Sequence, residues 1–237
     1  MTASPASDAT TTEDTAEPTR AMQRYAAEIY RLQQDHPQVG LAQLADQLEV
    51  TAQAVSRMVR RLEAAGLVRH TRYRGVRLTP AGERFSLPAI RRHRLVEVFL
   101  VDVMKFGVDE VHPLADVLEN GIDDAIEDRI DDLTGHPRHC PHGDPIPDRD
   151  GRLPELRDGP LAAFGGRHAT VSRVRTHDGE MMRYIYAIGA RPGAGVEVVR
   201  RAPFQGPLTL RLGGADVVVG RELAAAIWVT PAEDAPA

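Results

Sequence analysis

The sequence has little of several things that other classes of protein need. It contains one cysteine, Cys140, among 237 residues, so no internal disulfide can form and a reducing cytoplasm is the expected compartment. No apolar run approaches the ~18 residues of a membrane span, so no membrane partner is expected. Residues 1–19 have neither a basic start nor an apolar segment, which indicates a disordered tail and not a signal peptide.

Motifs that mark common enzymes are also missing. The sequence has no P-loop, no Gly-rich nucleotide fingerprint, and no Ser/His/Asp arrangement near a turn. A metalloenzyme would need an open coordination position, a base and a substrate cleft, and no separate base can be identified. We therefore expect a protein that is not an enzyme.

Charge is segregated along the chain, although the net charge is only −5. Lys105 is the only lysine, so arginine supplies almost all the positive charge. Residues 51–94 hold eleven arginines against two acidic residues, whereas residues 95–135 hold twelve acidic residues against Lys105 and Arg129. Two solvated helix faces would be an ordinary explanation. The abrupt change of sign favours a polyanionic partner for the first block.

Hydrophobic periodicity predicts a mainly α-helical chain with a small β domain. Stripes at helical spacing predict helices over 22–34, 41–50, 52–66, about 80–103, 108–120 and 122–133, with a hairpin over 67–79. After a Pro- and Gly-rich linker, short alternating β-branched runs and one short helix over 180–189 indicate a small β-barrel. The expected domains are a tail (1–19), a DNA-binding domain (20–80), a helical domain (81–137), a linker (138–160) and a β domain (161–237).

The order helix, short helix, capped helix and hairpin is typical of a winged helix-turn-helix. In such a unit the capped helix enters the major groove of DNA and the hairpin, called the wing, lies along the backbone. The alternative is a helical module that binds protein, but an Arg-rich helix beside an Arg-rich hairpin favours a polyanion. The side chains expected to contact bases or phosphates are Thr51, Gln53, Ser56, Arg57 and Arg60 on the helix and Arg72 and Arg74 on the wing.

Potential metal ligands recur at helical spacing in the acidic block. In VHPLADVLEN, His112, Asp116 and Glu119 stack on one helix face, and the pair His93 and Glu97 does the same on another helix. Each set alone fits a solvated surface. Together they could supply five nitrogen and oxygen donors to a metal from two helices.

These motifs, in their order and spacing, resemble the metal-dependent repressors of the diphtheria toxin repressor and manganese transport regulator type. The resemblance covers about Arg20 to the C-terminus and rests on LADQLEVTAQAVSRMVRRLEAAGLV, YRGVRLTPAGE, RRHRLVEVFL, VHPLADVLEN and CPHGDPIP. It implies a winged helix-turn-helix, a helical metal-binding and dimerisation domain, and an SH3-like domain of the FeoA type. The implied function is a metal-activated homodimeric repressor that binds a palindromic operator in double-stranded DNA and controls genes of metal-ion homeostasis.

The resemblance also implies a role for individual residues. His93, Glu97 and His112 match ligands of the family's ancillary metal site, to which Asp178, or Glu180, of the SH3-like domain would add. Asp116 and Glu119 match two ligands of its primary site. At other primary-site positions this sequence departs from the family, with Arg24, Ala27 and Asn120 in place of ligands. Arginine cannot bind a metal and asparagine binds only weakly, so we expect one intact site and one altered site.

The donor types narrow the metal. Iron-type members carry cysteine where Asp116 stands, and carboxylate-rich donors without thiolate suit Mn²⁺, with Fe²⁺ as the alternative. A separate zinc site made of His136, His139, Cys140 and His142 is possible, but the surrounding prolines and glycine indicate a turn. The acidic helix over 122–133 presents an apolar face that we expect to form the dimer interface. This face is made of Ile122, Ala125, Ile126, Ile130 and Leu133.

Two other functions remain open beside the repressor. Arg24 and Asn120 make a metal-independent or small-molecule-responsive winged-helix regulator plausible. An adaptor for iron trafficking could use the FeoA-like domain alone, although the winged helix argues against it.

Overall fold

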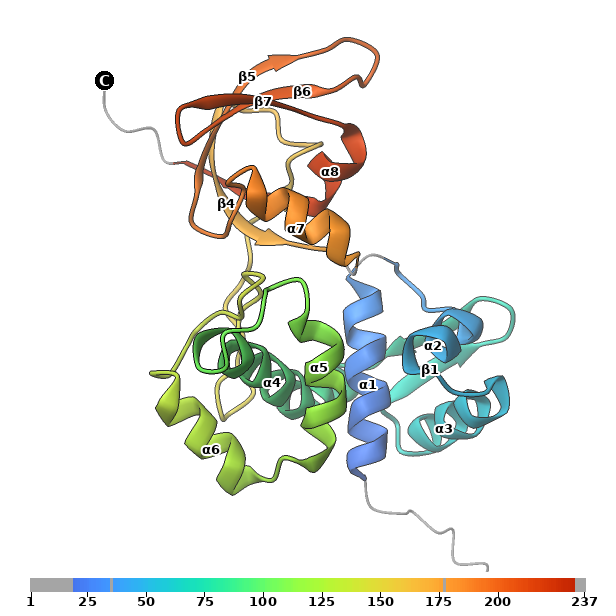
Figure 1. Ribbon diagram of the computed structural model, residues 1–237. Coiled ribbons are helices and arrows are strands. Elements are labelled where there is room, and N and C mark those ends of the chain that lie inside the picture. The colour runs from blue at the N-terminus through green and yellow to red at the C-terminus, as the bar shows by residue number, and fades with distance from the viewer. Residues whose placement is uncertain (1–18, 35, 177, 233–237) are drawn as a thin grey trace, which may run out of the picture. The chain divides into compact units, whose positions relative to one another are not determined.

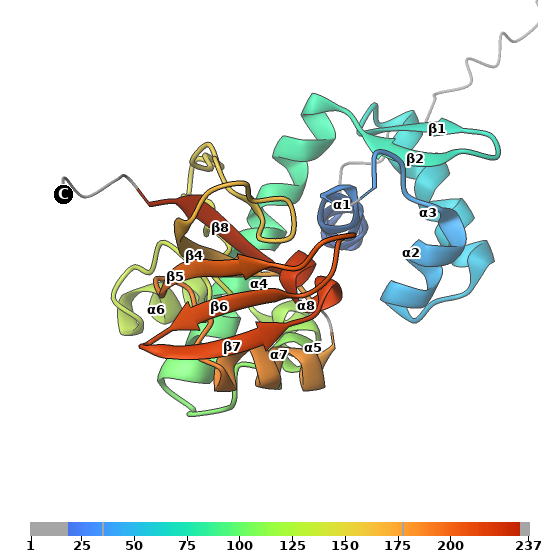
Figure 2. The same ribbon diagram turned by 90° about the horizontal axis from the view of Figure 1, so that it is seen from above.

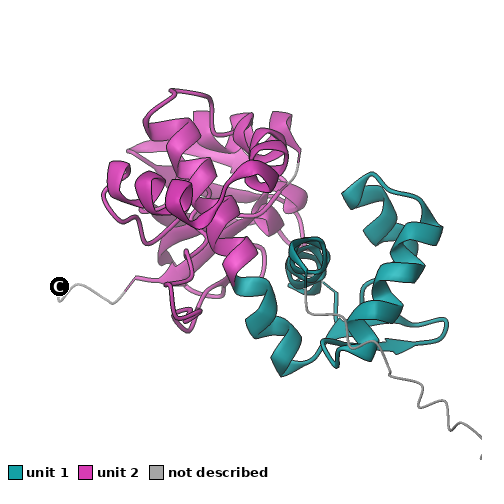
Figure 3. Ribbon diagram, turned by 90° about the horizontal axis from the view of Figure 1, so that it is seen from below, with its two compact units in different colours: residues 1–87 teal, residues 88–237 magenta. Residues whose placement is uncertain are grey.

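The computed structural model of the chain describes residues 19–34, 36–176 and 178–232, so the expected tail lies almost wholly outside the described residues. Within these ranges the chain forms two compact units, residues up to 87 and residues from 88 onward (Figure 3). No helix in the described ranges combines the length and the apolar composition that crossing a membrane requires.

The first unit is built from three helices and a hairpin (Figure 1). Only three residues separate the second helix from the third, and Glu49 makes this sharp turn possible by adopting a left-handed backbone with a φ of 53°. Fully buried apolar side chains such as Ile29, Leu44 and Val55 join the helices into one core. The elements are α1 (Arg20–Gln33), α2 (Leu41–Leu48), α3 (Ala52–Ala64), β1 (Val68–Thr71) and β2 (Gly75–Leu78).

Helix α4 (Pro80–Asp102) continues from the first unit into the second. The Thr79 hydroxyl accepts a hydrogen bond from Gly82 N at 3.1 Å and so caps the start of the helix, where Pro80 stands at the first position. A side chain at Gly82 would place its Cβ 1.9 Å from the Leu67 carbonyl oxygen, so only glycine fits there. Pro88 lies inside α4 at the boundary between the units, where its missing N–H removes a helical hydrogen bond.

The helical region of the second unit comprises the rest of α4, α5 (Val111–Leu118), a short 3₁₀ turn η1 (Glu119–Gly121) and α6 (Asp124–Leu133). Its core joins Leu95, Val111 and Ala115 to Ile122 and Ile130. Two residues of the expected dimer surface, Ile122 and Ile130, are only 8% and 7% exposed and pack inside their own chain, whereas Ile126 is 46% and Leu133 is 59% exposed. The dimer surface itself stays a prediction. The residues of the expected face have helical spacing, but the side chains of Ile122 and Ile130 belong to the core of their own chain.

The sheet region, residues 159–231, forms a six-stranded antiparallel sheet in the order β3-β8-β4-β5-β6-β7 (Figure 2). Bulges between Val171 and Arg173 and between Val198 and Arg200 bend two of its strands. Helices α7 (Gly179–Ala187) and α8 (Arg221–Ala226) contribute apolar side chains to its core. The strands are β3 (Gly159–Pro160), β4 (His168–Val174), β5 (Gly195–Arg201), β6 (Leu208–Leu212), β7 (Ala215–Val219) and β8 (Ile227–Pro231).

Candidate metal centre and nucleic-acid interface

A buried carboxylate on α4 faces two histidines from two helices. Glu97 Oε1 lies 3.1 Å from His93 Nε2, one helical turn earlier, and 3.0 Å from His112 Nδ1 on α5. The two ring nitrogens are themselves 3.1 Å apart, and both His93 and Glu97 are 2% exposed. One proton satisfies only one of these three contacts at a time. A cation would satisfy all three, so the arrangement suits a metal ion.

The other nitrogen of His93 faces a second pair of carboxylates. His93 Nδ1 lies 2.9 Å from Glu119 Oε2 and 3.3 Å from Asp116 Oδ1. His93, His112 and Asp116 each offer a ligand atom, and these atoms lie within 4.8 Å of one another. The structure thus brings together the five donors that spacing and resemblance singled out.

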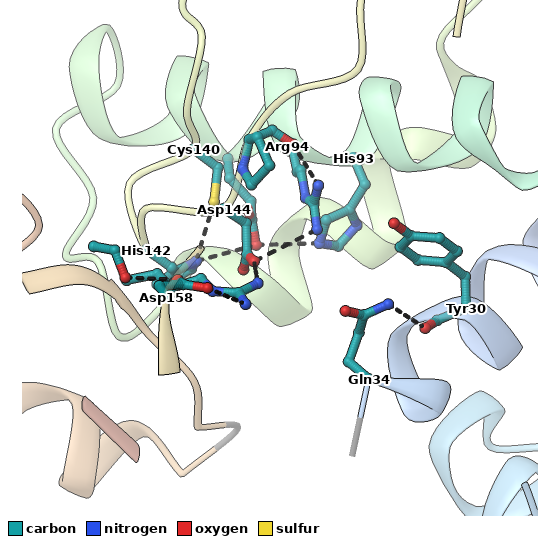
Figure 4. A network of polar contacts seen from close by, with 12 residues as sticks. Tyr30, Gln34, His93, Arg94, Cys140, His142, Asp144 and Asp158 are labelled. Carbon is teal, nitrogen blue, oxygen red and sulfur yellow. Dashed lines mark hydrogen bonds and ion pairs between the residues drawn. The ribbon is translucent and has the colours of Figure 1, made fainter. Parts of the chain in front are cut away.

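A second group of potential ligands also includes Glu97. Glu97, Cys140 and His142 offer ligand atoms within 4.8 Å of one another, and all three residues are buried. His142 Nδ1 lies 3.5 Å from Glu97 Oε1 and 4.0 Å from Cys140 Sγ (Figure 4). His142 Nε2 lies 2.8 Å from the Val108 carbonyl oxygen, which can only accept. That contact assigns a proton to Nε2. In the neutral ring, Nδ1 then has a lone pair that faces Glu97 and Cys140.

Cys140 and His142 were not expected from the sequence as partners of Glu97. Their segment was predicted to form a turn, and it does form one, with Gly143 N donating to Cys140 O at 2.9 Å. The turn is buried, however, and it places the Cys140 sulfur among the potential metal ligands, which was not expected from the sequence. A cysteine and a histidine two residues apart in one tight turn were the available signal. His136, by contrast, lies 3.3 Å from Asp131, with 70% of its side chain exposed.

The electrostatics of this group favour positive charge beside Glu97. Burial by itself would raise the pKa of Glu97, but the charges of His142 and His93 outweigh it and hold that pKa well below its ordinary value. Burial also opposes charge on His142, yet the Glu97 carboxylate raises the pKa of His142 well above its ordinary value. Burial, with the Glu97 charge second, raises the pKa of the Cys140 thiol.

Two further expected ligands, Asp178 and Asn120, make hydrogen bonds to backbone atoms. Asp178 is the N-cap of α7, and its Oδ1 accepts hydrogen bonds from Glu180 N at 2.8 Å and Met181 N at 3.1 Å. The Asn120 amide donates to the Asp116 carbonyl oxygen at 2.8 Å, so its side chain folds back on its own helix. Arg24 and Ala27 lie on α1, in the first unit.

The candidate DNA-contacting residues lie on or beside α3 and on the wing. Thr51 caps α3, its hydroxyl accepting a hydrogen bond from Ala54 N at 3.2 Å. At the wing tip, Tyr73 is 90% exposed with a left-handed φ of 64°, and the Arg72 guanidinium carbon lies 4.8 Å from its ring centre. The sequence analysis did not single out this tyrosine. The expected contacts Thr51, Gln53, Arg57, Arg60, Arg72 and Arg74 are exposed, and Ser56 is half-buried.

Comparison with known protein families divides the chain into three matched segments. Residues 18–76 match the iron dependent repressor N-terminal DNA binding domain, and residues 79–148 match the iron dependent repressor metal binding and dimerisation domain. Residues 164–231 match the FeoA domain. The candidate metal ligands fall in the second segment and the candidate DNA contacts in the first.

Individual relatives and solved structures agree with these matches. The chain is 29% identical over 216 residues to the diphtheria toxin repressor of Corynebacterium efficiens, covering 86% of this chain and 93% of that one. It is 36% identical over 119 residues to the transcriptional regulator MntR of Shouchella clausii, covering 49% of this chain and 80% of that one. A solved manganese-dependent transcriptional repressor in complex with manganese is 37% identical with a TM-score of 0.81, covering 89% of this chain and 100% of that one.

Proposed function

The chain belongs to the family of metal-dependent transcriptional repressors that includes the diphtheria toxin repressor and MntR, and we propose that a divalent metal ion controls its affinity for operator DNA. The observation that carries the proposal is the position of Glu97, whose Oε1 lies within 3.5 Å of ring nitrogens of His93, His112 and His142. A winged helix-turn-helix in the same chain supplies the DNA-binding surface.

Two adjacent metal sites follow from the grouping of the donors. His93, His112 and Asp116, with Glu119 beside them, would hold one ion, Cys140 and His142 would hold the other, and Glu97 would be a ligand that both sites share. Bound metal supplies positive charge that neutralises the carboxylates and links α4, α5 and the turn after α6. Carboxylate and imidazole donors suit Mn²⁺, which we propose as the cellular metal, with Fe²⁺ as the alternative. The Cys140 sulfur makes the second site the softer of the two.

The DNA-binding form is proposed to be a homodimer on a palindromic operator. A two-fold dimer places two copies of α3 in successive major grooves. With Ile122 and Ile130 buried, the exposed apolar side chains near α5 and α6 are the candidate dimer surface: Val117, Leu118, Ile126 and Leu133. Such a repressor of metal-ion homeostasis genes acts where its operator is, in the cytoplasm.

Two substitutions favour a second candidate function. Arg24 and Asn120 replace family ligands, and Arg24 cannot bind a metal. A regulator that has lost its metal response, or answers a small molecule, would carry such changes. That regulator would bind operator DNA equally well with or without metal.

Fluorescence anisotropy with labelled operator DNA separates the two functions. We expect Mn²⁺ to tighten binding relative to excess EDTA, and a variant carrying both His93→Ala and His112→Ala to lose that difference. Glu155→Gln, an exposed change in the linker outside both donor groups, is the matched control and should respond like the unsubstituted protein. Equal affinity in EDTA and in Mn²⁺ would contradict the metal switch.

A further inference from the structure

The turn that carries Cys140 and His142, residues 140–144, is held in place by the sheet region. The Val174 amide at the end of β4 donates to the His142 carbonyl oxygen at 2.8 Å. The Tyr186 hydroxyl on α7 donates to the Pro141 carbonyl oxygen at 2.6 Å. Both bonds fix backbone atoms between or at the two candidate ligands, so the sheet region sets the conformation of the turn.

A buried arginine adds a charged contact to the same turn. Arg173, 5% exposed, donates from Nη1 to Asp144 Oδ1 at 3.0 Å and from Nε to Asp158 Oδ2 at 2.8 Å. Its guanidinium also lies 4.5 Å from the ring centre of Trp228. From the helical side, Arg94 contacts Asp144 at 3.7 Å (Figure 4). Asp144 therefore ties the turn to both regions of the second unit.

The fit between the turn and β4 is close. Gly143 has a φ of 94°, and a side chain there would place its Cβ 2.2 Å from the Ser172 carbonyl oxygen. The turn cannot shift toward β4, and the hydrogen bonds to Val174 and Tyr186 resist movement away from it. Burial raises the pKa of the Tyr186 phenol, so the hydroxyl keeps the proton that it donates to Pro141.

We propose that Tyr186 and Arg173 are positioning residues that hold Cys140 and His142 in the arrangement that binds metal. Neither side chain is a ligand; each acts through the backbone or carboxylate of the turn. The proposal rests on the second of the two metal sites proposed above. The sheet region would thus support metal binding by holding the turn in place, whether or not Asp178 supplies a ligand.

The same contacts couple metal binding to the docking of the sheet region. If a docked sheet region favours metal binding, then bound metal must stabilise the docked state by the same factor. The hydrogen bond from Val174 N to His142 O reports this state directly. We expect metal to slow hydrogen exchange at the Val174 amide, because exchange requires that bond to open.

Cobalt titration of the full-length protein tests the positioning role. Co²⁺ bound by a thiolate shows a near-ultraviolet charge-transfer band, and Cys140 is the only cysteine, so the band reports this site alone. Tyr186→Phe removes only the hydroxyl and should weaken Co²⁺ binding about tenfold. Arg173→Lys keeps the charge but cannot bond both carboxylates in the same way, and should weaken binding in the same direction.

Tyr184→Phe is the matched control. It removes a hydroxyl from the same helix, where Tyr184 is 47% exposed, and should leave Co²⁺ affinity unchanged. If Tyr186→Phe and Tyr184→Phe bind Co²⁺ equally, the positioning role is overturned while the site stands. If Cys140→Ser keeps the full band, the site itself is overturned.

Hydrogen exchange on the unsubstituted protein gives a measurement that needs no variant. Slower exchange at Val174 with Co²⁺, absent in Cys140→Ser, supports the coupling, and unchanged exchange overturns it. These outcomes are independent of DNA. If Tyr186 and Arg173 position the ligands but metal does not change the affinity for operator DNA, the proposed function is rejected and the positioning role stands.

Discussion

Glu97 Oε1 on α4 lies 3.5 Å from His142 Nδ1 on the turn after α6, and the same oxygen contacts His93 and His112. A single buried carboxylate therefore joins two groups of candidate ligands that come from separate parts of the chain. Substitution of Glu97 should therefore weaken metal binding by both groups, whereas substitution of a residue that belongs to only one group should weaken metal binding by that group alone.

Glu97→Gln should reduce the affinity for Mn²⁺ at both sites, because an amide replaces the charged oxygen that the two groups share. By comparison with changes around other metal sites, we expect a loss of at least about tenfold. Isothermal titration calorimetry measures affinity and stoichiometry together. Glu155→Gln, an exposed change in the linker, is the control and should leave Mn²⁺ binding unchanged; if Glu97→Gln binds Mn²⁺ as tightly as this control, the assignment of Glu97 as the shared ligand is wrong.

Cys140→Ser should change metal preference more than it changes Mn²⁺ binding. Thiolate favours softer ions, so affinity for Zn²⁺ or Co²⁺ should fall further than affinity for Mn²⁺. Competition titrations with a chromophoric chelator give the three affinities. The reaction of the lone thiol with a disulfide reagent provides a check, because a metal-bound sulfur should react more slowly. Equal losses for all three ions would count against sulfur ligation.

Arg57→Ala and Arg72→Ala should weaken operator binding in different ways. Arg57 on α3 is expected to contact base edges, and its loss should cost about 1–3 kcal/mol and relax the sequence preference. Arg72 on the wing is expected to contact phosphate, and its loss should weaken binding to all sequences and reduce the salt slope by about one. Anisotropy at several salt concentrations, with operator and unrelated DNA, separates the two effects. Arg152→Ala, in the exposed linker, should alter neither.

Ile130→Ala and Ile126→Glu should separate folding from dimerisation. Ile130 is 7% exposed, and truncation should lower the free energy of unfolding by about 2–5 kcal/mol. Ile126 is 46% exposed, so a charge there should shift the protein toward monomer with little cost to the fold. Denaturant unfolding and sedimentation velocity measure the two properties. A dimer unaffected by Ile126→Glu would place the dimer surface elsewhere.

Tyr73→Ala should weaken operator binding without changing the metal response. The ring is exposed at the wing tip in contact with Arg72 and packs against no core residue, so its removal should leave the fold intact. Comparison of operator affinity with and without Mn²⁺ gives both quantities in one titration. Unchanged affinity at saturating metal would exclude the tyrosine from the DNA interface.

Local patterns were enough to predict most of the helices and several strands. Thr51 and Thr79 mark helix starts because a threonine oxygen can accept from a free amide at the first turn, and both do so. The winged helix-turn-helix with an SH3-like β domain, predicted from element order and from the family resemblance, is confirmed by the matched segments. Helix α8 and strands β3 and β8 were not singled out. Elements of six and two residues such as α8 and β3 carry little periodic signal, and β8 follows α8 with no turn between them.

By itself, the sequence determined which side chains share a helix face, because the helical period is a local property of the backbone. His93 and Glu97, like His112 and Asp116, lie one turn apart for that reason. Only the tertiary structure decided that a buried turn would bring Cys140 and His142 to Glu97, and that Ile122 and Ile130 would face the core. Those outcomes depend on packing between segments distant along the chain, where burial and close contact, not spacing, select the neighbours.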